Sequence, residues 1–314
     1  MVQPQGFWSA LLATLVCLVP AGEAAAQVYP RAFQMSVWNC CGASPTNLDQ
    51  DVASFSDGYP QPPGRSIMFG FDWSTPVSAR HYDWSRILAV ENDEPFTSVG
   101  GSPCASINYN QQFSAISNQL AARASELATV APLTRFWVNF TPREVGWMKG
   151  GCSMVNQAYM DVVSEDRYYD YFYPTVEPDY DWLVSHPATP YQQVALVPGT
   201  FYRPGHDDPS RQADILDGYF SYAFWQNQTC NLPRGPRGIT GSYDGCPVWI
   251  VFAWLSGNWT DPKDGTNYVG EVDPRLADTV TAAWRAQVAV PLRPGLDHQL
   301  SRGQILELIQ MLDQ

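Results

Sequence analysis

Short apolar runs rich in β-branched and aromatic residues recur along the chain, and polar or glycine-containing segments separate them. Runs of this length and composition are typical of buried β-strands. Seven such runs occur, at residues 33–38, 66–71, 87–90, 136–140, 159–163, 194–198 and 248–254. The sequence therefore predicts at least seven strands.

Between the later runs, apolar residues recur every three or four positions, which indicates helices. The predicted helices span residues 111–130, 176–185, 214–226 and 274–288, and residues 304–312 read as a closing amphipathic helix. Alternating strands and helices are typical of an α/β fold with a parallel sheet. No Gly-x-Gly-x-x-Gly follows a strand, so a closed (β/α)8 TIM-type barrel is favoured over a Rossmann-type sheet. The eighth strand is not visible, which leaves an incomplete or irregular barrel as the expectation.

Two polar segments, residues 43–63 and 97–112, are rich in Gly, Pro, Ser and Asn. Long loops of this composition usually carry binding or catalytic residues, so we interpret them as loops at the mouth of the barrel. No repeat, low-complexity tract or linker divides residues 27–314. The sequence predicts a single barrel domain there.

The N-terminus has the pattern of a secretory signal peptide. Residues 7–21 are apolar, and Ala24, Ala25 and Ala26 supply the small residues that signal peptidase requires. We expect residues 1–26 to be removed and the mature protein to begin at Gln27, secreted and without membrane insertion. An uncleaved anchor is the alternative, because a basic segment before the apolar stretch is lacking.

The cysteine count supports an oxidising compartment. Of the seven cysteines, Cys17 lies in the predicted signal peptide, which leaves six in the mature chain. An even number in a secreted protein indicates disulfides. We predict a Cys230–Cys246 bridge across a Gly/Pro/Arg-rich loop. The sequence does not choose among the pairings of Cys40, Cys41, Cys104 and Cys152.

Charge limits the partners. The net charge is −13 and the pI is near 4.6, so there is no basic face to neutralise phosphates. Nucleic acid and anionic lipid are therefore not expected as partners. A neutral or cationic substrate fits better, although charge alone does not identify a reaction.

Two segments carry clustered acids immediately after apolar runs. Residues 86–96 contain Asp93 and Glu94, and residues 158–169 contain Glu165 and Asp166. In barrels, the residues just past the carboxyl ends of the strands line the catalytic mouth. Hydrolysis of a glycosidic bond needs two carboxyl groups that flank it, and these two couples could supply them.

Alternation along a strand lets only one member of each couple point inward. Asp161 would share the inward face with Val163, and Glu165 would follow if the strand stays regular. If the strand ends at Val163, Asp166 turns inward instead, and this is the arrangement we favour. The alternatives are a salt bridge of Glu165 or Asp166 with an arginine, and a surface turn or helix N-cap at Asp93 and Glu94.

The pattern formed by Asp161, Ser164, Asp166 and Tyr168 resembles the strand ends of secreted glycoside-hydrolase-like (β/α)8 barrels. The resemblance extends to residues 93–96, 137–144 and 251–256. It implies a carbohydrate-active enzyme without a redox cofactor. Glycosidases of the large barrel clan place Asn-Glu together after the fourth strand and a second Glu after the seventh. Here Asn139 and Glu144 are separated and the run at 248–254 ends in Trp254, so that catalytic pair is not carried over.

We therefore predict a secreted glycosidase that acts on an oligo- or polysaccharide, with Glu94 and Asp166 as the catalytic pair. Asp93, Asn139 and Asp161 would position substrate or tune the pair, and Tyr202 and Trp254 would form a sugar platform. Glu144 is a reserve proton donor, and the alternative is an acid in the first turn of a helix. The competing hypothesis is a non-catalytic carbohydrate-binding or surface protein on a degenerate barrel.

Neither a metal nor a cofactor is expected. The chain has four histidines, with no His-Glu-x-x-His motif and no His pair at i,i+4 spacing. The His206-Asp207-Asp208 segment reads as a solvated loop rather than as a metal site. An α/β-hydrolase is also disfavoured, because no Gly-x-Ser-x-Gly turn is present.

Overall fold

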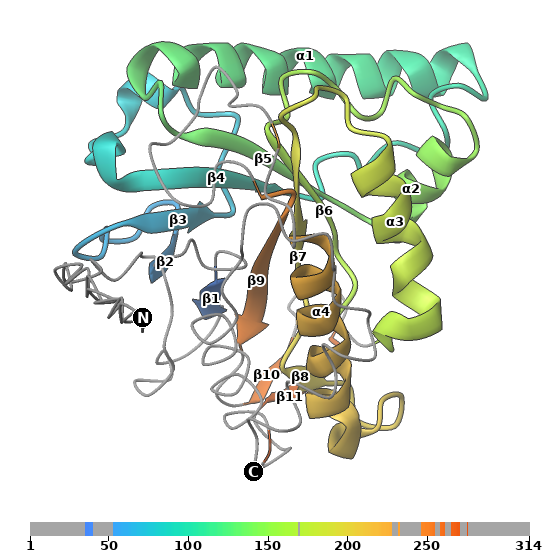
Figure 1. Cartoon of the computed structure of the whole chain (residues 1–314). Helices are drawn as coiled ribbons and strands as arrows, with labels where there is room; N and C mark the ends of the chain where they lie inside the picture. The colour runs from blue at the N-terminus through green and yellow to red at the C-terminus, as the bar shows by residue number, and fades with distance from the viewer. Residues whose placement is uncertain are drawn as a thin grey trace, which may run out of the picture.

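The computed structural model describes residues 35–39, 53–168, 170–227, 232, 246–254, 258–260, 265–270 and 275. Its centre is a sheet of eight strands in the order β1-β9-β7-β6-β5-β4-β3-β2, and every neighbouring pair is parallel (Figure 1). The strands are β1 (Met35–Asn39), β2 (Ala53–Ser56), β3 (Ser66–Phe69), β4 (Ile87–Asp93), β5 (Arg135–Phe140), β6 (Val162–Glu165), β7 (Gln193–Leu196) and β9 (Val248–Trp254). The predicted α/β fold with a parallel sheet is confirmed.

The sheet curls back on itself. Its two edge strands, β1 and β2, lie beside each other, although no ladder of hydrogen bonds joins them. The strands follow one another around the curl in chain order, apart from β8, which belongs to a second sheet. This sequential order arises because each parallel pair needs a crossover connection between its strands.

All seven predicted strands are present, with bounds shifted by up to a few residues. The eighth is β2, so the interpretation of residues 43–63 as a loop throughout is wrong at 53–56. The strand reads Ala-Ser-Phe-Ser, and Phe55 is its only large apolar residue. Such a short segment carries too little hydrophobic pattern to be recognised alone; pairing with β3 defines it as a strand.

Helices follow the middle strands in turn. They are α1 (Ile107–Val130) after β4, α2 (Pro142–Lys149) after β5, α3 (Glu177–Ser185) after β6 and α4 (Gln212–Gln226) after β7. Three correspond to predicted helices, and α2 was not predicted because it is short. Single turns occur at η1 (Val77–Ala79), η2 (Trp84–Arg86), η3 (Phe172–Val176) and η4 (Pro209–Arg211). The predicted signal peptide and the helices at 274–288 and 304–312 lie outside the described residues.

The long helix α1 runs along one side of the molecule (Figure 1). Ser106 begins it as an N-cap, because its side chain accepts a hydrogen bond from the Tyr109 backbone N–H. Phe113, Leu120 and Leu127 are buried and lie on one stripe of the helix, which packs into the core.

Alternating residues of the strands divide the core into two layers. One layer lies between sheet and helices and includes Met68, Val90 and Val163 together with apolar residues of all four helices. The other is built from strand residues and the loop residue Val197, with Trp137 and Trp249 as its largest members. This second layer lies on the concave face, and its side chains fill the inside of the curl.

A second, three-stranded antiparallel sheet lies beyond the carboxyl end of β9 (Figure 1). It consists of β10 (Asn258–Thr260), β11 (Asn267–Gly270) and β8 (Phe201–Tyr202). Because β8 follows β7 and β10 follows β9, this small sheet lies at the same end as the loops that would carry a site.

A disulfide joins Cys104, before α1, to Cys152, after α2, with the two Cα atoms 5.6 Å apart. The sequence had left this pairing open. Cys246 is also disulfide-bonded, and its predicted partner Cys230 lies outside the described residues.

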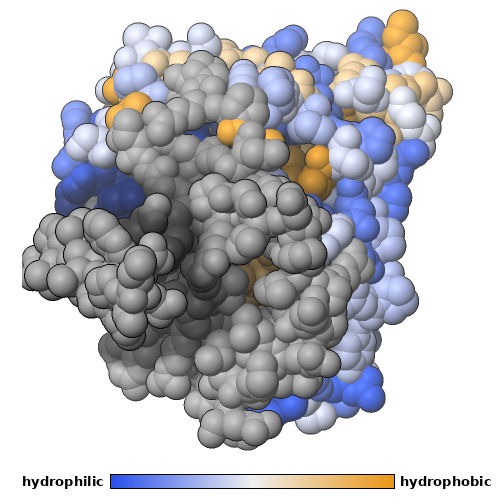
Figure 2. Space-filling model, in the orientation of Figure 1, coloured by the Kyte–Doolittle hydropathy of each residue, from blue (hydrophilic) through white to orange (hydrophobic). Residues whose placement is uncertain are grey.

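Within the described part, no helix is both long and apolar enough to cross a membrane. On the face in Figure 2 the described residues are mostly hydrophilic, with hydrophobic residues in small groups.

Candidate functional site

Carboxyl groups from β4 and β6 meet at the carboxyl end of the curled sheet. Alternation along β4 places Glu91 and Asp93 on the same concave face as Ala89. On β6, Val162 and Ser164 face the same interior, and Asp166 follows them one residue beyond the strand. The three acids are close enough to perturb one another electrostatically.

Asp166, directly after β6, is partly buried and has a strongly perturbed carboxyl group. Burial raises the pKa of its carboxyl well above the usual range, and the nearby charges of Asp93 and Glu94 raise it further. Hydrogen bonds from Tyr168 and Asn139 oppose this shift only in part. Its Oδ1 atom is shielded from solvent and has no hydrogen-bond partner. Burial and the neighbouring acids therefore favour the protonated form of the Asp166 carboxyl.

Glu91 lies deeper than Asp166, with 4% of its surface exposed. Burial and the charge of Asp93 raise the pKa of Glu91 well above its usual value, although the Gly70 backbone N–H donates to its Oε2 atom at 3.0 Å. Asp93 itself is exposed. The cluster thus grades from a buried acid at its base to an accessible carboxylate at its rim.

A chain of hydrogen bonds fixes the amide of Asn139 on β5. The Trp137 indole N–H donates to Ser164 Oγ at 2.7 Å, and that hydroxyl donates to Asn139 Oδ1 at 2.6 Å. The Asn139 Nδ2 atom then donates to Asp93 Oδ1 at 3.1 Å. Because the Asn139 oxygen accepts from Ser164 while its nitrogen donates to Asp93, the amide orientation is defined and Asp93 is held in place.

Glu94 follows β4 and has a left-handed backbone, with φ 42°. It is the non-glycine residue with positive φ within the described part of the chain. Its backbone N–H donates to the Asn139 carbonyl, and its own carbonyl accepts from Thr97. Such strain costs roughly 1 kcal/mol or more and tends to occur at functional sites.

Tyr168 closes the cluster from the β6 side. Burial and the charge of Asp166 raise the pKa of its phenol well above the usual range, so the hydroxyl stays protonated and can donate. Its ring lies 5.2 Å from that of Phe201, centroid to centroid. A Cβ atom at Gly199 would approach the Tyr168 Cβ to 2.7 Å, so this close approach requires glycine.

Glu165 points away from the cluster, into the layer between sheet and helices. Arg167 Nε lies 3.5 Å from its Oε1 atom. Burial and the charge of Asp179 on α3 raise the pKa of Glu165 to about 8. The inward face predicted for Asp161, Val163 and Glu165 is wrong, because β6 continues to Glu165 and turns the opposite set of residues inward.

Asp161 does not lie with the other acids. It precedes β6 at the opposite end of the strand, is buried, and accepts a hydrogen bond from the Phe136 backbone N–H at 2.8 Å through Oδ2. The prediction that it positions substrate is therefore corrected. The predicted strand at 159–163 starts three residues before β6, which placed Asp161 inside the strand instead of before it.

The remaining predicted residues are dispersed. Glu144 forms a capping box with Thr141 at the start of α2. It is thus an acid in the first turn of a helix, as the alternative interpretation had it, and not a proton donor. Tyr202 is half-buried on β8 opposite Val269. Trp254 ends β9 in register with Asn39, and its side chain lies outside what the structure describes.

Glu91 was not recognised from the sequence. The signal was its alternation with Ala89 and Asp93 in a strand that extends past Val90, where the apolar run stops.

Asp207, in the segment interpreted as a solvated loop, accepts hydrogen bonds from Arg203. Across the described residues, no group of three or more His, Cys, Asp or Glu side chains is arranged to hold a metal ion.

No family model matches the chain, and no curated protein matches it. Among solved structures, the chain is similar to Bacteroides uniformis beta-glucuronidase 2 covalently bound to cyclophellitol-6-carboxylate aziridine. That match has 11% sequence identity and a TM-score of 0.44, and it covers 75% of this chain and 31% of the other. The chain thus spans about a third of that protein's length, and the likeness assigns neither a family nor an activity.

Proposed function

We propose that this protein hydrolyses a glycosidic bond in an oligo- or polysaccharide, with Asp166 as proton donor and Glu94 as the second carboxylate. One observation carries the proposal. The Asp166 carboxyl, with a buried and unpartnered Oδ1 atom, faces Asp93 and Glu94 at the carboxyl end of the sheet. We infer that the sheet is a TIM-type barrel, in which this end is the catalytic one.

The chemistry follows from the two environments. Burial and neighbouring acids raise the pKa of the Asp166 carboxyl and favour its protonated form, which is the form that protonates the leaving glycosidic oxygen. Glu94, half-exposed after β4, is ionised in this scheme. It attacks the anomeric carbon directly or activates a water, depending on how far apart the two carboxyl groups lie.

Neighbouring residues support this pair. Asp93 and Asn139 hold each other and would orient sugar hydroxyls. Tyr202 and Trp254 are proposed as the sugar platform, since pyranose C–H faces pack on aromatic rings. Secretion through the predicted signal peptide and the absence of a redox cofactor complete the proposal. A non-catalytic sugar-binding protein is the second candidate, because the run that ends at Trp254 supplies no acid.

The test is release of reducing ends from a panel of oligo- and polysaccharides by the wild type, Asp166→Asn and Glu94→Gln. Each variant should lose at least about a hundredfold in kcat, the range expected when a general acid or its partner is removed. Glu165→Gln is the matched control: it removes the adjacent carboxyl on the opposite face, and its activity should stay within a few-fold of wild type.

Wild-type activity that survives in Asp166→Asn would contradict the proposal. So would an equal loss in Glu165→Gln, because the effect would then reflect general damage to β6. Absence of release on every substrate, together with measurable sugar binding, would favour the non-catalytic candidate.

A further inference from the structure

A second feature lies at the same end of the sheet. Residues after β2 and β3 enclose a surface cleft of about 640 Å³, whose walls include Asp57, Tyr59, Gly70, Asp72, His81 and Tyr82. Asp57 follows β2 and Gly70 follows β3 directly. The cleft is therefore formed at the carboxyl ends of β2 and β3, and β3 pairs with β4, which carries Glu91 and Asp93.

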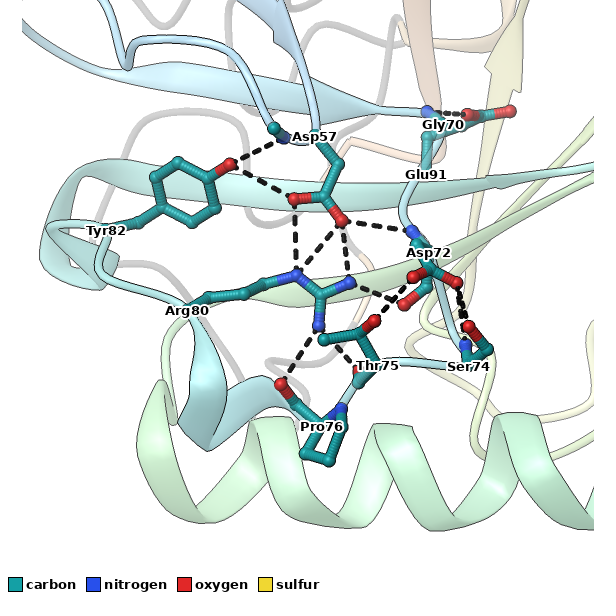
Figure 3. A network of polar contacts seen from close by, with 10 residues as sticks. Asp57, Gly70, Asp72, Ser74, Thr75, Pro76, Arg80, Tyr82 and Glu91 are labelled. Carbon is teal, nitrogen blue, oxygen red and sulfur yellow. Dashed lines mark hydrogen bonds and ion pairs between the residues drawn. The ribbon is translucent and has the colours of Figure 1, made fainter.

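Arg80 is the structural centre of this cleft (Figure 3). Its Nε and Nη2 atoms donate to Asp57, and its Nη1 atom donates to the carbonyls of Thr75 and Pro76. The side chain is 6% exposed and its guanidinium lies 4.2 Å above the Phe71 ring. Arg80 is fully used in holding the cleft together and is not available to bind a phosphate or carboxylate.

The cleft is consequently acidic. Burial alone would raise the pKa of Asp57. Hydrogen bonds from Arg80 and the Asp72 backbone outweigh this effect and lower it. Hydrogen bonds from Ser74 and Thr75 lower the pKa of Asp72. Both carboxylates stay ionised; Arg80 forms an ion pair with Asp57, and its charge also lowers the pKa of Asp72. Such a wall repels anions and accepts hydrogen bonds from hydroxyl groups.

Tyr59 supplies an exposed aromatic ring at the edge of the cleft. Its backbone N–H donates to the Ser56 carbonyl at 3.1 Å, which closes a turn with Gly58 at φ 86° in the third position. A positive φ there is typical of a type II turn and favours glycine. Tyr59 is 67% exposed, and its side chain makes no hydrogen bond or ring contact among the described residues.

Tyr82, by contrast, is fixed. Its hydroxyl accepts from the Gly58 N–H at 2.7 Å and donates to Asp57 Oδ1 at 3.1 Å (Figure 3). Its ring packs edge-on against Phe55 and Trp84. The cleft thus joins a rigid wall to one free aromatic ring.

Gly70 connects the cleft to the acid cluster. It lines the cleft, and its backbone N–H donates to Glu91 Oε2 at 3.0 Å (Figure 3). Gly70 therefore lies between the cleft and Glu91, the buried acid at the base of the cluster.

We propose that this cleft is a carbohydrate subsite, in which Tyr59 stacks on one sugar ring and Asp72, whose Oδ2 atom accepts only from Thr75 within the described part of the chain, accepts a hydrogen bond from a sugar hydroxyl. The subsite binds neutral sugar units of a chain that extends beyond the acid cluster. This inference rests on the proposed function, which places the bond to be cleaved at the acid cluster. Binding of a sugar in the cleft does not itself require catalysis.

The test compares wild type, Tyr59→Ala and Tyr191→Ala on an array of immobilised neutral oligosaccharides, from di- to hexasaccharides. Tyr191 precedes β7 at the opposite end of the sheet, so its substitution controls for loss of a tyrosine. For the sugar that wild type binds, Tyr59→Ala should weaken hexasaccharide binding about threefold to tenfold, as expected for loss of one aromatic contact. Disaccharide binding should change less, and Tyr191→Ala should match wild type.

The outcomes separate the two proposals. Equal affinities of Tyr59→Ala and wild type at every chain length would overturn the subsite, even if hydrolysis is observed. Binding that depends on Tyr59 without hydrolysis of any substrate would support the subsite and contradict the glycosidase. Absence of binding by wild type to every array sugar would also overturn the subsite.

Discussion

Glu165 and Asp166 are adjacent in the chain, yet they face different surroundings. Ser164 and Asp166 belong to the concave face and Glu165 to the helix side, because side chains of a strand alternate. Both carboxyls have raised pKa values, but only Asp166 lies among other acids at the carboxyl end of the sheet. A perturbed pKa alone therefore does not identify the catalytic residue; the side of the strand does.

The buried Glu165 should make stability fall as pH rises. Its pKa is about 8 in the folded protein against a usual value of 4.5, so between these values the folded state holds a proton that the unfolded state has released. Stability should decline by up to about 1.4 kcal/mol per pH unit across this window. Glu165→Gln should flatten that decline, with a higher urea midpoint than wild type at pH 8 and little difference near pH 4.5.

Glu126 on α1 is the matched control with the opposite sign. Hydrogen bonds from Ser78 outweigh burial and lower the pKa of Glu126 to about 2. Its contribution is present above the unfolded pKa and is lost on acidification, so Glu126→Gln should destabilise at neutral pH. A Glu165→Gln midpoint that is lower than wild type at pH 8 would contradict the assignment of a raised pKa.

At the scale of elements, α2 fixes the end of β5. Thr141 accepts a hydrogen bond from the Glu144 backbone N–H, while the Glu144 carboxylate accepts from the Thr141 backbone N–H at 2.6 Å. Pro142 at the first helical turn has the fixed φ that a helix start requires. This capping box sets the turn that directly follows β5, two residues after Asn139, so a local sequence signal stabilises the geometry of the site.

Thr141→Ala should destabilise the protein by about 1 kcal/mol, the usual cost of losing an N-cap side chain. The measurement is the urea midpoint at constant m-value. Thr129→Ala, near the end of α1 and exposed, removes a hydroxyl bonded only to the Ser125 carbonyl and should change stability by less than about 0.5 kcal/mol. Equal effects in the two variants would argue against the capping role.

At the scale of the whole molecule, the Cys104–Cys152 disulfide ties the loop before α1 to the end of α2. Its sequence separation is 48 residues, so it restrains a long segment that contains α1 and β5. The bond also fits an oxidising compartment, as the cysteine count predicted.

Removing both cysteines, as Cys104→Ala/Cys152→Ala, should lower the free energy of unfolding by about 4 kcal/mol according to chain-entropy estimates for a loop of this length. Urea unfolding of the double variant under non-reducing conditions checks this value. A free energy of unfolding equal to that of wild type would show that the disulfide does not restrain the unfolded chain.

The sequence by itself determined the alternation of strands and helices and the presence of acids after the predicted strands. These follow from hydrophobic periodicity, which is a property of the chain read locally. It also determined the N-terminal apolar segment and the seven cysteines of the chain.

Only the tertiary structure decided which acids meet. Asp166 joins Asp93 and Glu94 because β6 starts at Val162, whereas Asp161 lies at the far end. A shift of one residue in the bounds of a strand reverses which side chains face inward. Local periodicity does not fix these bounds. The strand β2 and the cleft beside it likewise depend on pairing between segments that are separate in the chain. A local hydrophobic pattern does not predict such pairing.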